Sequence, residues 1–191
     1  MKAKQILLFF IGLTFLTSCY GNESTNHSAI RNENPNQAFI SQPNEDIDQI
    51  IFGVYCGECF CRCATMYRYN LEGNQNSFSI DYTDSFFSQE NHNNNNKKMM
   101  FDTYMNDKFH FNIGTEIIAN IPDTLLNSDK PSQRFGCPDC SDGCGIYFEL
   151  TRNGETKRFF IDYQTSQLTG EIKVFAEFLK DKLMILDGVR H

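Results

Sequence analysis

The 191-residue sequence lacks the short motifs that identify common enzymes. It has no Gly-x-Ser-x-Gly elbow, no glycine-rich phosphate loop and no His-Glu-x-x-His zinc helix. Positive charge is scarce, because 17 Lys and Arg residues face 24 Asp and Glu residues, for a net charge of -7. Such a chain is repelled by nucleic acid and by anionic lipid headgroups. The sequence therefore offers no catalytic residue and speaks against a nucleic-acid partner.

The N-terminus has the layout of a secretory signal. Lys2 and Lys4 form a short positive region, and the apolar segment Ile6–Leu16 follows it. This segment is shorter than the roughly 20 apolar residues that a bilayer-spanning helix needs. The next residues, Leu16-Thr17-Ser18-Cys19, resemble the lipobox of bacterial lipoproteins. A generic signal peptide with an incidental Cys19 is the alternative, and its product would be secreted and soluble.

The lipobox resemblance implies cleavage before Cys19, a diacylglyceryl thioether on its sulfur and a fatty acyl chain, such as palmitate, on its new amino group. Two or more such chains hold a protein stably at a membrane. Removal of residues 1–18 would eliminate two lysines and leave a net charge of -9. Tyr20 stands where enteric bacteria use Asp to retain lipoproteins at the inner membrane. We therefore expect a lipid-anchored envelope protein, at the outer membrane or cell surface rather than the inner membrane.

The mature chain divides into a polar tether and one folded domain. Residues 19–46 carry the lipidated Cys19 and then a stretch rich in Asn, Ser, Gln and Glu, which buries too little apolar surface to fold. Residues 47–187 have the length of a single domain. Within it, the Asn-rich segment 88–98 is predicted to be a mobile loop.

Alternating apolar and polar residues predict two β-hairpins in this domain. Strands are expected at 67–71 and 78–82, joined by a turn at 73–76. Asn153-Gly154 predicts a second hairpin with a type I′ turn, because both residues tolerate positive φ. If these two residues form the loop, Phe148 lies opposite Phe159 and Glu149 lies opposite Arg158.

Two amphipathic helices complete the expected fold. After Gly170, apolar residues recur at helical spacing and predict a helix of about four turns. Thr115 is the predicted N-cap of a shorter helix that ends before Pro122, whereas segment 99–105 is ambiguous between helix and strand. Since strands and helices do not alternate regularly, the predicted class is α+β, with an antiparallel sheet packed on these helices.

Beyond Cys19, seven cysteines lie in two short segments. In an export context, disulfides between the segments are the leading interpretation. Three cysteines of the first segment are expected to face three of the second, and sequence cannot choose the pairing. An odd thiol remains, for which Cys56 is the candidate. The six predicted to pair are Cys59, Cys61, Cys63, Cys137, Cys140 and Cys144.

Metal binding is the alternative interpretation of the same residues. Cys56-x-x-Cys59 and Cys137-x-x-Cys140 have the spacing of a tetrahedral Cys₄ zinc site. The additional cysteines also suit a thiolate cluster for copper, which prefers soft sulfur ligands as Cu(I). On the disulfide interpretation no cofactor is expected.

Cys137-Pro138-Asp139-Cys140 also allows a third interpretation, a thiol–disulfide oxidoreductase. The active cysteine of such enzymes lies at a helix N-terminus, where the helix dipole lowers the pKa of the thiol. Here Gly143 and Gly145 follow, and then a predicted strand. The context therefore disfavours this activity.

The segments Gly57–Tyr67 and Gly136–Gly143 resemble small cysteine-rich bacterial envelope proteins, domains of unknown function with Cys-x-x-x-Cys and Cys-Pro-Asp-Cys-x-Asp segments. The resemblance covers roughly residues 56–186. It implies a shared set of Cys59, Cys63, Cys137 and Cys140, from which Cys56, Cys61 and Cys144 depart. The resemblance carries no activity.

These observations predict a non-enzymatic, lipid-anchored envelope domain with a structural or partner-binding role. Its partners would be the membrane, through Cys19, and another envelope protein. A zinc- or copper-binding envelope lipoprotein is the alternative, and thiol–disulfide exchange is the third.

Overall fold

A computed structural model describes residues 46–57, 63–71, 76–88, 98–138, 140 and 143–188. The predicted signal peptide, the lipidation residue Cys19 and the tether up to residue 45 lie outside the described residues. So do Cys59, Cys61 and residues 89–97 of the predicted Asn-rich loop.

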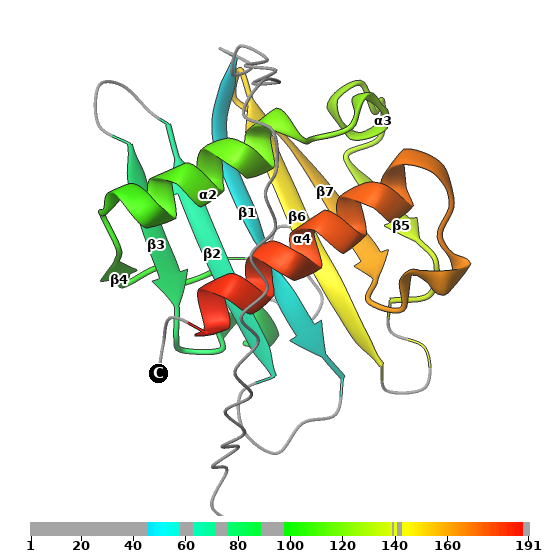
Figure 1. The fold of residues 1–191 in the computed structure, drawn as a ribbon, viewed down its shortest axis with the longest axis horizontal. Coiled ribbons are helices and arrows are strands. Elements are labelled where there is room, and N and C mark those ends of the chain that lie inside the picture. Colours follow the sequence, from blue (N-terminus) through cyan, green and yellow to red (C-terminus); the bar gives the residue numbers. More distant parts are fainter. Residues whose placement is uncertain are drawn as a thin grey trace, which may run out of the picture. The chain divides into compact units, whose positions relative to one another are not determined.

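Seven strands of the described chain form one sheet, in the order β4-β3-β2-β1-β6-β7-β5 (Figure 1). Neighbouring strands are antiparallel except for β5, which pairs in parallel with β7. The predicted α+β class is confirmed, and the sheet is mixed through this one pair. The strands are β1 (Ile47–Cys56), β2 (Ala64–Asn70), β3 (Ser77–Asp81), β4 (Thr103–Tyr104), β5 (Ser132–Phe135), β6 (Cys144–Arg152) and β7 (Glu155–Asp162).

Strand β1 lies at the centre of the sheet and is buried on both faces. Ile50 and Phe52 belong to the core cluster that contains the helix residues, whereas Ile51 and Tyr55 belong to a second cluster. A strand buried on both sides reads as a continuous apolar run. This is why the sequence around Ile47–Cys56 shows no alternation of apolar and polar residues.

The hairpin between β6 and β7 has the predicted register. Asn153 and Gly154 form its loop with φ of 51° and 77°. Phe148 pairs with Phe159, and Glu149 pairs with Arg158. The predicted pairing of the first hairpin is also observed, since β2 and β3 are antiparallel neighbours.

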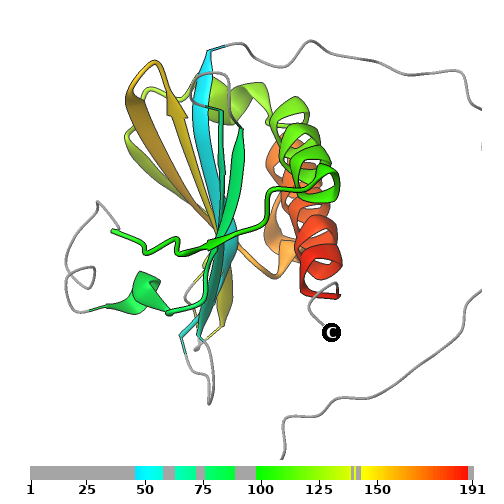
Figure 2. The ribbon, with the colours of Figure 1, turned by 90° about the vertical axis from the view of Figure 1, so that its left-hand side faces the viewer.

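Two helices cover one face of the sheet (Figure 2): α2 (Lys108–Ala119) and α4 (Gly170–Gly188). The predicted apolar face of α4 is buried, and the ring of its Phe175 lies 5.0 Å from that of Phe148 on β6. Among the helices of the described ranges, none has the length and apolar character needed to span a bilayer.

The predicted capping of α2 is wrong. Its N-cap is Asp107, whose side chain accepts a hydrogen bond from His110 N at 3.0 Å. Thr115 lies two turns later, where its hydroxyl donates to the carbonyl of Phe111 at 2.9 Å. The helix starts earlier because Asp107 satisfies one of the free N–H groups of the first turn. Segment 99–105, ambiguous in sequence, contains only the short strand β4.

The other face of the sheet carries η1 (Ser85–Phe87) and the chain that leads to β4 (Figure 2). Ser85 Oγ donates a hydrogen bond to the buried Asp81 carboxylate at 2.5 Å and accepts one from Met100 N at 2.8 Å. The ring of Phe86 packs on Tyr55 at 5.0 Å. These contacts hold two loop segments over the sheet.

The remaining elements, α3 (Asp123–Leu126) and η3 (Thr165–Gln167), are short. Helix α3 follows α2 and begins directly after Pro122. Together with the β6–β7 hairpin it lines one of the cavities described below.

Candidate functional site

The described cysteines gather at one end of the sheet. Cys56 ends β1 and Cys144 begins β6, and the two residues lie directly opposite each other in the strand pairing. They form a disulfide with a Cα–Cα distance of 4.0 Å. Cys137 and Cys140, in the segment between β5 and β6, form a second disulfide. Cys63, just before β2, is disulfide-bonded as well.

The predicted disulfide character is therefore confirmed, but two details of the predicted pairing are wrong. Cys56 is not a free thiol, because the antiparallel pairing of β1 with β6 places it against Cys144. Cys137 bonds to Cys140 of its own segment and not to a cysteine of the first segment. The unpredicted strand β1 explains the first error, since without it Cys56 had no assigned neighbour.

The candidate zinc set contained Cys56, Cys59, Cys137 and Cys140. Three of these are bonded in disulfides, whereas a metal ligand must be a thiolate. Cys59 lies outside the described residues. Among the residues that the structure does describe, no group of three or more His, Cys, Asp or Glu side chains is arranged to hold a metal ion.

A cavity of about 590 Å³ adjoins the two disulfides. Cys137 and Cys140 are exposed there, and Cys144 is half-buried. The cavity is lined by Cys137, Cys140, Gly143, Cys144, Asp162, Tyr163, Gln164 and Gln167.

Asp162, at the end of β7, holds the start of this cysteine segment through a hydrogen bond to its backbone. Its Oδ2 accepts a hydrogen bond from Cys137 N at 3.0 Å, and its Oδ1 accepts one from Gln164 N at 2.8 Å. Gly136 precedes Cys137 with a φ of 72°, and a Cβ there would lie 2.6 Å from Cβ of Asp162. The buried carboxylate thus anchors one end of the exposed disulfide to the sheet.

The local structure around Cys137 differs from that of a thioredoxin-like site. Cys140 N donates to the Cys137 carbonyl at 3.1 Å, and Gly143 N donates to the Cys140 carbonyl at 3.1 Å. Cys140 itself has 3-10 conformation, and the next strand in the described chain is β6. The described residues between β5 and β6 therefore place no α-helix N-terminus at either sulfur.

The two disulfides constrain the unfolded chain to different extents. In the chain-entropy model, a bridge across 88 positions contributes about 4.5 kcal/mol, and one across 3 positions about 2 kcal/mol. Cys56–Cys144 is therefore the main structural crosslink of the described pair. Cys137–Cys140 constrains only its own loop.

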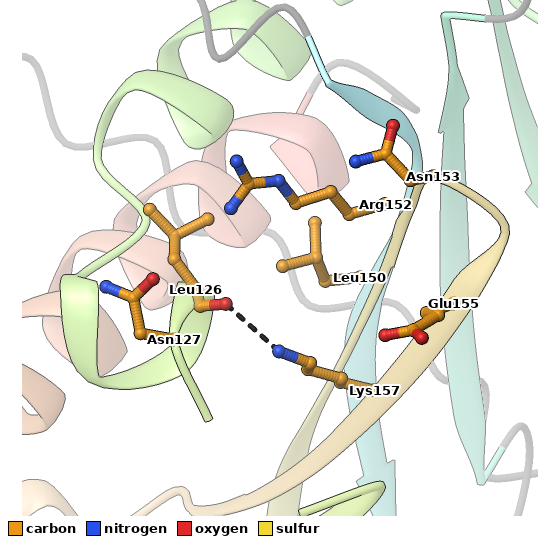
Figure 3. A pocket seen from close by; sticks show the side chains of 7 residues that line it. All are labelled: Leu126, Asn127, Leu150, Arg152, Asn153, Glu155 and Lys157. Carbon is orange, nitrogen blue, oxygen red and sulfur yellow. Dashed lines mark hydrogen bonds between the residues drawn. The ribbon is translucent and has the colours of Figure 1, made fainter. Parts of the chain in front are cut away.

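A second cavity, of about 440 Å³, lies between α3 and the tip of the β6–β7 hairpin (Figure 3). It is at the other end of β6, about 26 Å from Cys144 at 3.3 Å per residue. Two leucines and five polar or charged residues line it: Leu126, Leu150, Asn127, Arg152, Asn153, Glu155 and Lys157.

Two cations, Arg152 and Lys157, line this second cavity. Lys157 Nζ donates a hydrogen bond to the Leu126 carbonyl at 3.1 Å (Figure 3), and Arg152 forms an ion pair with Asp46 at 2.9 Å. Arg152 Nε is buried and has no hydrogen-bond partner among the described residues. The sequence analysis missed this cavity, although two cations flanking the Asn153-Gly154 turn were visible in the sequence.

A buried polar cluster lies on the sheet face opposite the helices. The Tyr147 hydroxyl donates to Glu149 Oε2 at 2.6 Å, and Arg158 Nε lies 2.9 Å from the same oxygen. Burial raises the pKa of Glu149 above its ordinary value, although Tyr147 and Arg158 oppose this shift. Burial also raises the pKa of Tyr147. With Glu149 only 6% exposed, the cluster is a structural element of the sheet rather than a surface site.

Comparison with protein-family models finds no match, and comparison with curated proteins finds none either.

Proposed function

We propose that this chain is a lipid-anchored protein of the bacterial cell envelope that works by binding a partner and not as an enzyme. The observation that carries this proposal is the Cys56–Cys144 disulfide, which crosslinks the two central strands of the sheet. Disulfides persist in oxidising compartments and are rare in the cytosol. Such a crosslink between the ends of the two central strands supports export.

The exposed Cys137–Cys140 disulfide adds to this argument. Cytosolic thiols would have direct access to both of its sulfurs, because both residues lie at the surface. Its presence in the folded state is consistent with the secretory signal at Lys2–Leu16. The Leu16-Thr17-Ser18-Cys19 box supplies the anchor.

The cavity of Figure 3 is the binding site that we propose. Its volume of about 440 Å³ lies within the range of small-ligand sites, roughly 300–1,000 Å³. Lys157 uses one ammonium hydrogen on the Leu126 carbonyl and keeps two others for a ligand. The buried Nε of Arg152 supplies another donor. Glu155 also lines the cavity and Arg152 is paired with Asp46, so the charge left for a ligand is mainly that of Lys157; with the Arg152 Nε donor it favours an anionic group of the partner, such as a carboxylate.

The proposed lipid anchor is tested by membrane fractionation and by mass spectrometry of the intact protein. The wild-type protein, expressed in a lipoprotein-processing bacterium, should partition into detergent with a mass that shows loss of residues 1–18 and addition of fatty acyl chains at Cys19. Cys19→Ser should give a protein without lipid that leaves the membrane fraction. A wild-type protein whose N-terminus is intact, or whose Cys19 thiol is unmodified, would refute the anchor.

The cavity is tested with defined anions and NMR. Citrate and inorganic phosphate are the probes, and glucose is the neutral comparison. We expect citrate to shift the backbone amides of Asn127 and Lys157 saturably, and Lys157→Met to weaken this binding severalfold. The matched control is Lys173→Met, which removes a partly exposed lysine of α4 that does not line the cavity. Equal shifts by glucose, or equal weakening by the control, would exclude an anion site.

A further inference from the structure

The two disulfides for which the structure describes both cysteines, Cys56–Cys144 and Cys137–Cys140, differ in how accessible they are to an attacking thiolate. Cys137 and Cys140 are both exposed, and they line the 590 Å³ cavity. Cys56 and Cys144 are half-buried at the ends of paired central strands. Thiol–disulfide exchange requires a thiolate to reach one sulfur, so access is a primary determinant of its rate.

The two disulfides also differ in what their reduction would disturb. The strands β1 and β6 hold Cys56 against Cys144 along a continuous ladder of paired residues, from Cys56–Cys144 to Gln49–Thr151. Two thiols held this way would re-form their bond readily, because each is confined beside the other. Cys137 and Cys140 lie in turns outside the ladder, and opening their short ring leaves every strand pair in place.

The cysteine segment keeps its position independently of the Cys137–Cys140 bond. Asp162 accepts a hydrogen bond from Cys137 N, and Cys140 N donates to the Cys137 carbonyl. Backbone contacts of this kind do not depend on the oxidation state of sulfur. The reduced pair would therefore stay at the cavity, ready to be oxidised again.

From these observations we propose that Cys137–Cys140 is a stoichiometric thiol–disulfide exchange site whose partner is a protein dithiol of the cell envelope. The proposal goes beyond the binding role; it rests on the proposed export of the domain to the cell envelope but not on the lipid anchor. The sequence context disfavoured thiol–disulfide exchange because no helix dipole was expected to lower the pKa of a thiol. The proposal rests instead on the accessibility of the Cys137–Cys140 disulfide.

The exchange balances without an additional reagent. A thiolate of the partner attacks one sulfur of the pair, the Cys137–Cys140 bond breaks, and the released thiolate takes up a proton. The second thiol of the partner then attacks the mixed disulfide. The partner leaves as a disulfide and the domain keeps two thiols, so two electrons and two protons have passed to the domain.

The first test is a site-resolved redox titration of the purified oxidised protein. Dithiothreitol at graded ratios of reduced to oxidised form is the probe, followed by acid quench, alkylation and peptide mass spectrometry. We expect Cys137 and Cys140 to become reduced, and therefore alkylated, at a low ratio of reduced to oxidised dithiothreitol. The ratio needed to reduce Cys56 and Cys144 should be about tenfold or more higher. Circular dichroism should stay unchanged at that stage. Simultaneous alkylation of both pairs, or alkylation only after loss of structure, would overturn the proposal.

The second test measures transfer to a dithiol substrate. A reduced two-cysteine peptide, labelled to report its own disulfide, is mixed with the oxidised protein. Wild type and Cys56→Ala/Cys144→Ala should oxidise it rapidly, and Cys137→Ala/Cys140→Ala should lack that rapid phase. An unchanged rapid phase in Cys137→Ala/Cys140→Ala would contradict the proposal. If the Cys56→Ala/Cys144→Ala control does not fold, the titration of the wild type decides.

Discussion

Arg158 Nε lies 2.9 Å from Glu149 Oε2, across the β6–β7 ladder and on the sheet face opposite the helices. Their side chains are 15% and 8% exposed. The pair follows from the Asn153-Gly154 turn, since a two-residue loop places these positions directly opposite each other. The sequence of the turn thus determines which two charged residues form a buried ion pair.

Replacing one residue of this pair should lower the free energy of unfolding more than replacing both. Glu149→Leu or Arg158→Leu leaves a buried charge without its partner and should lower the free energy of unfolding by about 3 kcal/mol. Glu149→Leu/Arg158→Leu should lower the free energy of unfolding by clearly less than the sum of the two single losses, because no uncompensated charge remains and only the Tyr147 hydroxyl loses its acceptor. Urea unfolding of the three variants measures this. A double variant that loses the sum of the two single losses would show that the pair is not coupled.

The raised pKa of Glu149 predicts an unusual contribution to the pH dependence of stability. Between the ordinary Glu value of 4.5 and the raised folded pKa, the folded protein holds a proton that the unfolded chain has released. The free energy of unfolding contributed by this group therefore falls as pH rises through that window and is fully present below it.

The comparison with Glu149→Gln isolates this contribution. Relative to this variant, the wild type should gain stability as pH is lowered, because only the wild type takes up the proton on folding. Denaturant unfolding from pH 4 to pH 8 measures the difference, and Glu155→Gln, an exposed position, is the control. A wild type that instead loses stability relative to Glu149→Gln on acidification would mean that the pKa of Glu149 is depressed.

The two disulfides should differ in their contribution to global stability. Cys56→Ala/Cys144→Ala should lower the free energy of unfolding by about 4.5 kcal/mol, since the bond closes a long loop. Cys137→Ala/Cys140→Ala should lower it by about 2 kcal/mol or less, since its loop is short. Urea unfolding under non-reducing conditions makes the comparison. Equal losses would argue against the assignment of Cys56–Cys144 as the main crosslink.

Gly114 should be sensitive to substitution although it lies within a helix. The ring of Tyr69 packs directly against the position that a Cβ would occupy. Gly114→Ala should therefore destabilise the protein by about 1–3 kcal/mol, despite the higher helix propensity of alanine. Asn112→Ala, at an exposed position of the same helix, should be neutral or slightly stabilising. Thermal unfolding separates the two, and a stabilised Gly114→Ala would disprove the close contact.

The sequence was sufficient to predict those elements whose structure is determined by residues close together in the chain. The Asn153-Gly154 turn gave the register of β6 and β7 down to the Glu149–Arg158 pair. The apolar spacing after Gly170 gave α4 and its buried face. In each case residues that are close in sequence contain the information.

The sequence was insufficient where distant segments meet. Strand β1 has no alternation because both of its faces are buried, and β5 is short and pairs in parallel with a later strand. Without β1, Cys56 was assigned as a leftover thiol although its partner Cys144 lies 88 positions away. The cavity of Figure 3 was missed for the same reason, because it forms where α3 meets a hairpin.

The central claim is that this disulfide-bonded domain is displayed in the cell envelope on a lipid. The most direct measurement is the intact mass of the protein isolated from the cells that naturally make it, with free thiols blocked before lysis. The account predicts a chain that begins at Cys19, carries acyl chains there, and retains the Cys56–Cys144 bond. A chain that retains residues 1–18, or whose Cys56 and Cys144 are both blocked as free thiols, would contradict it.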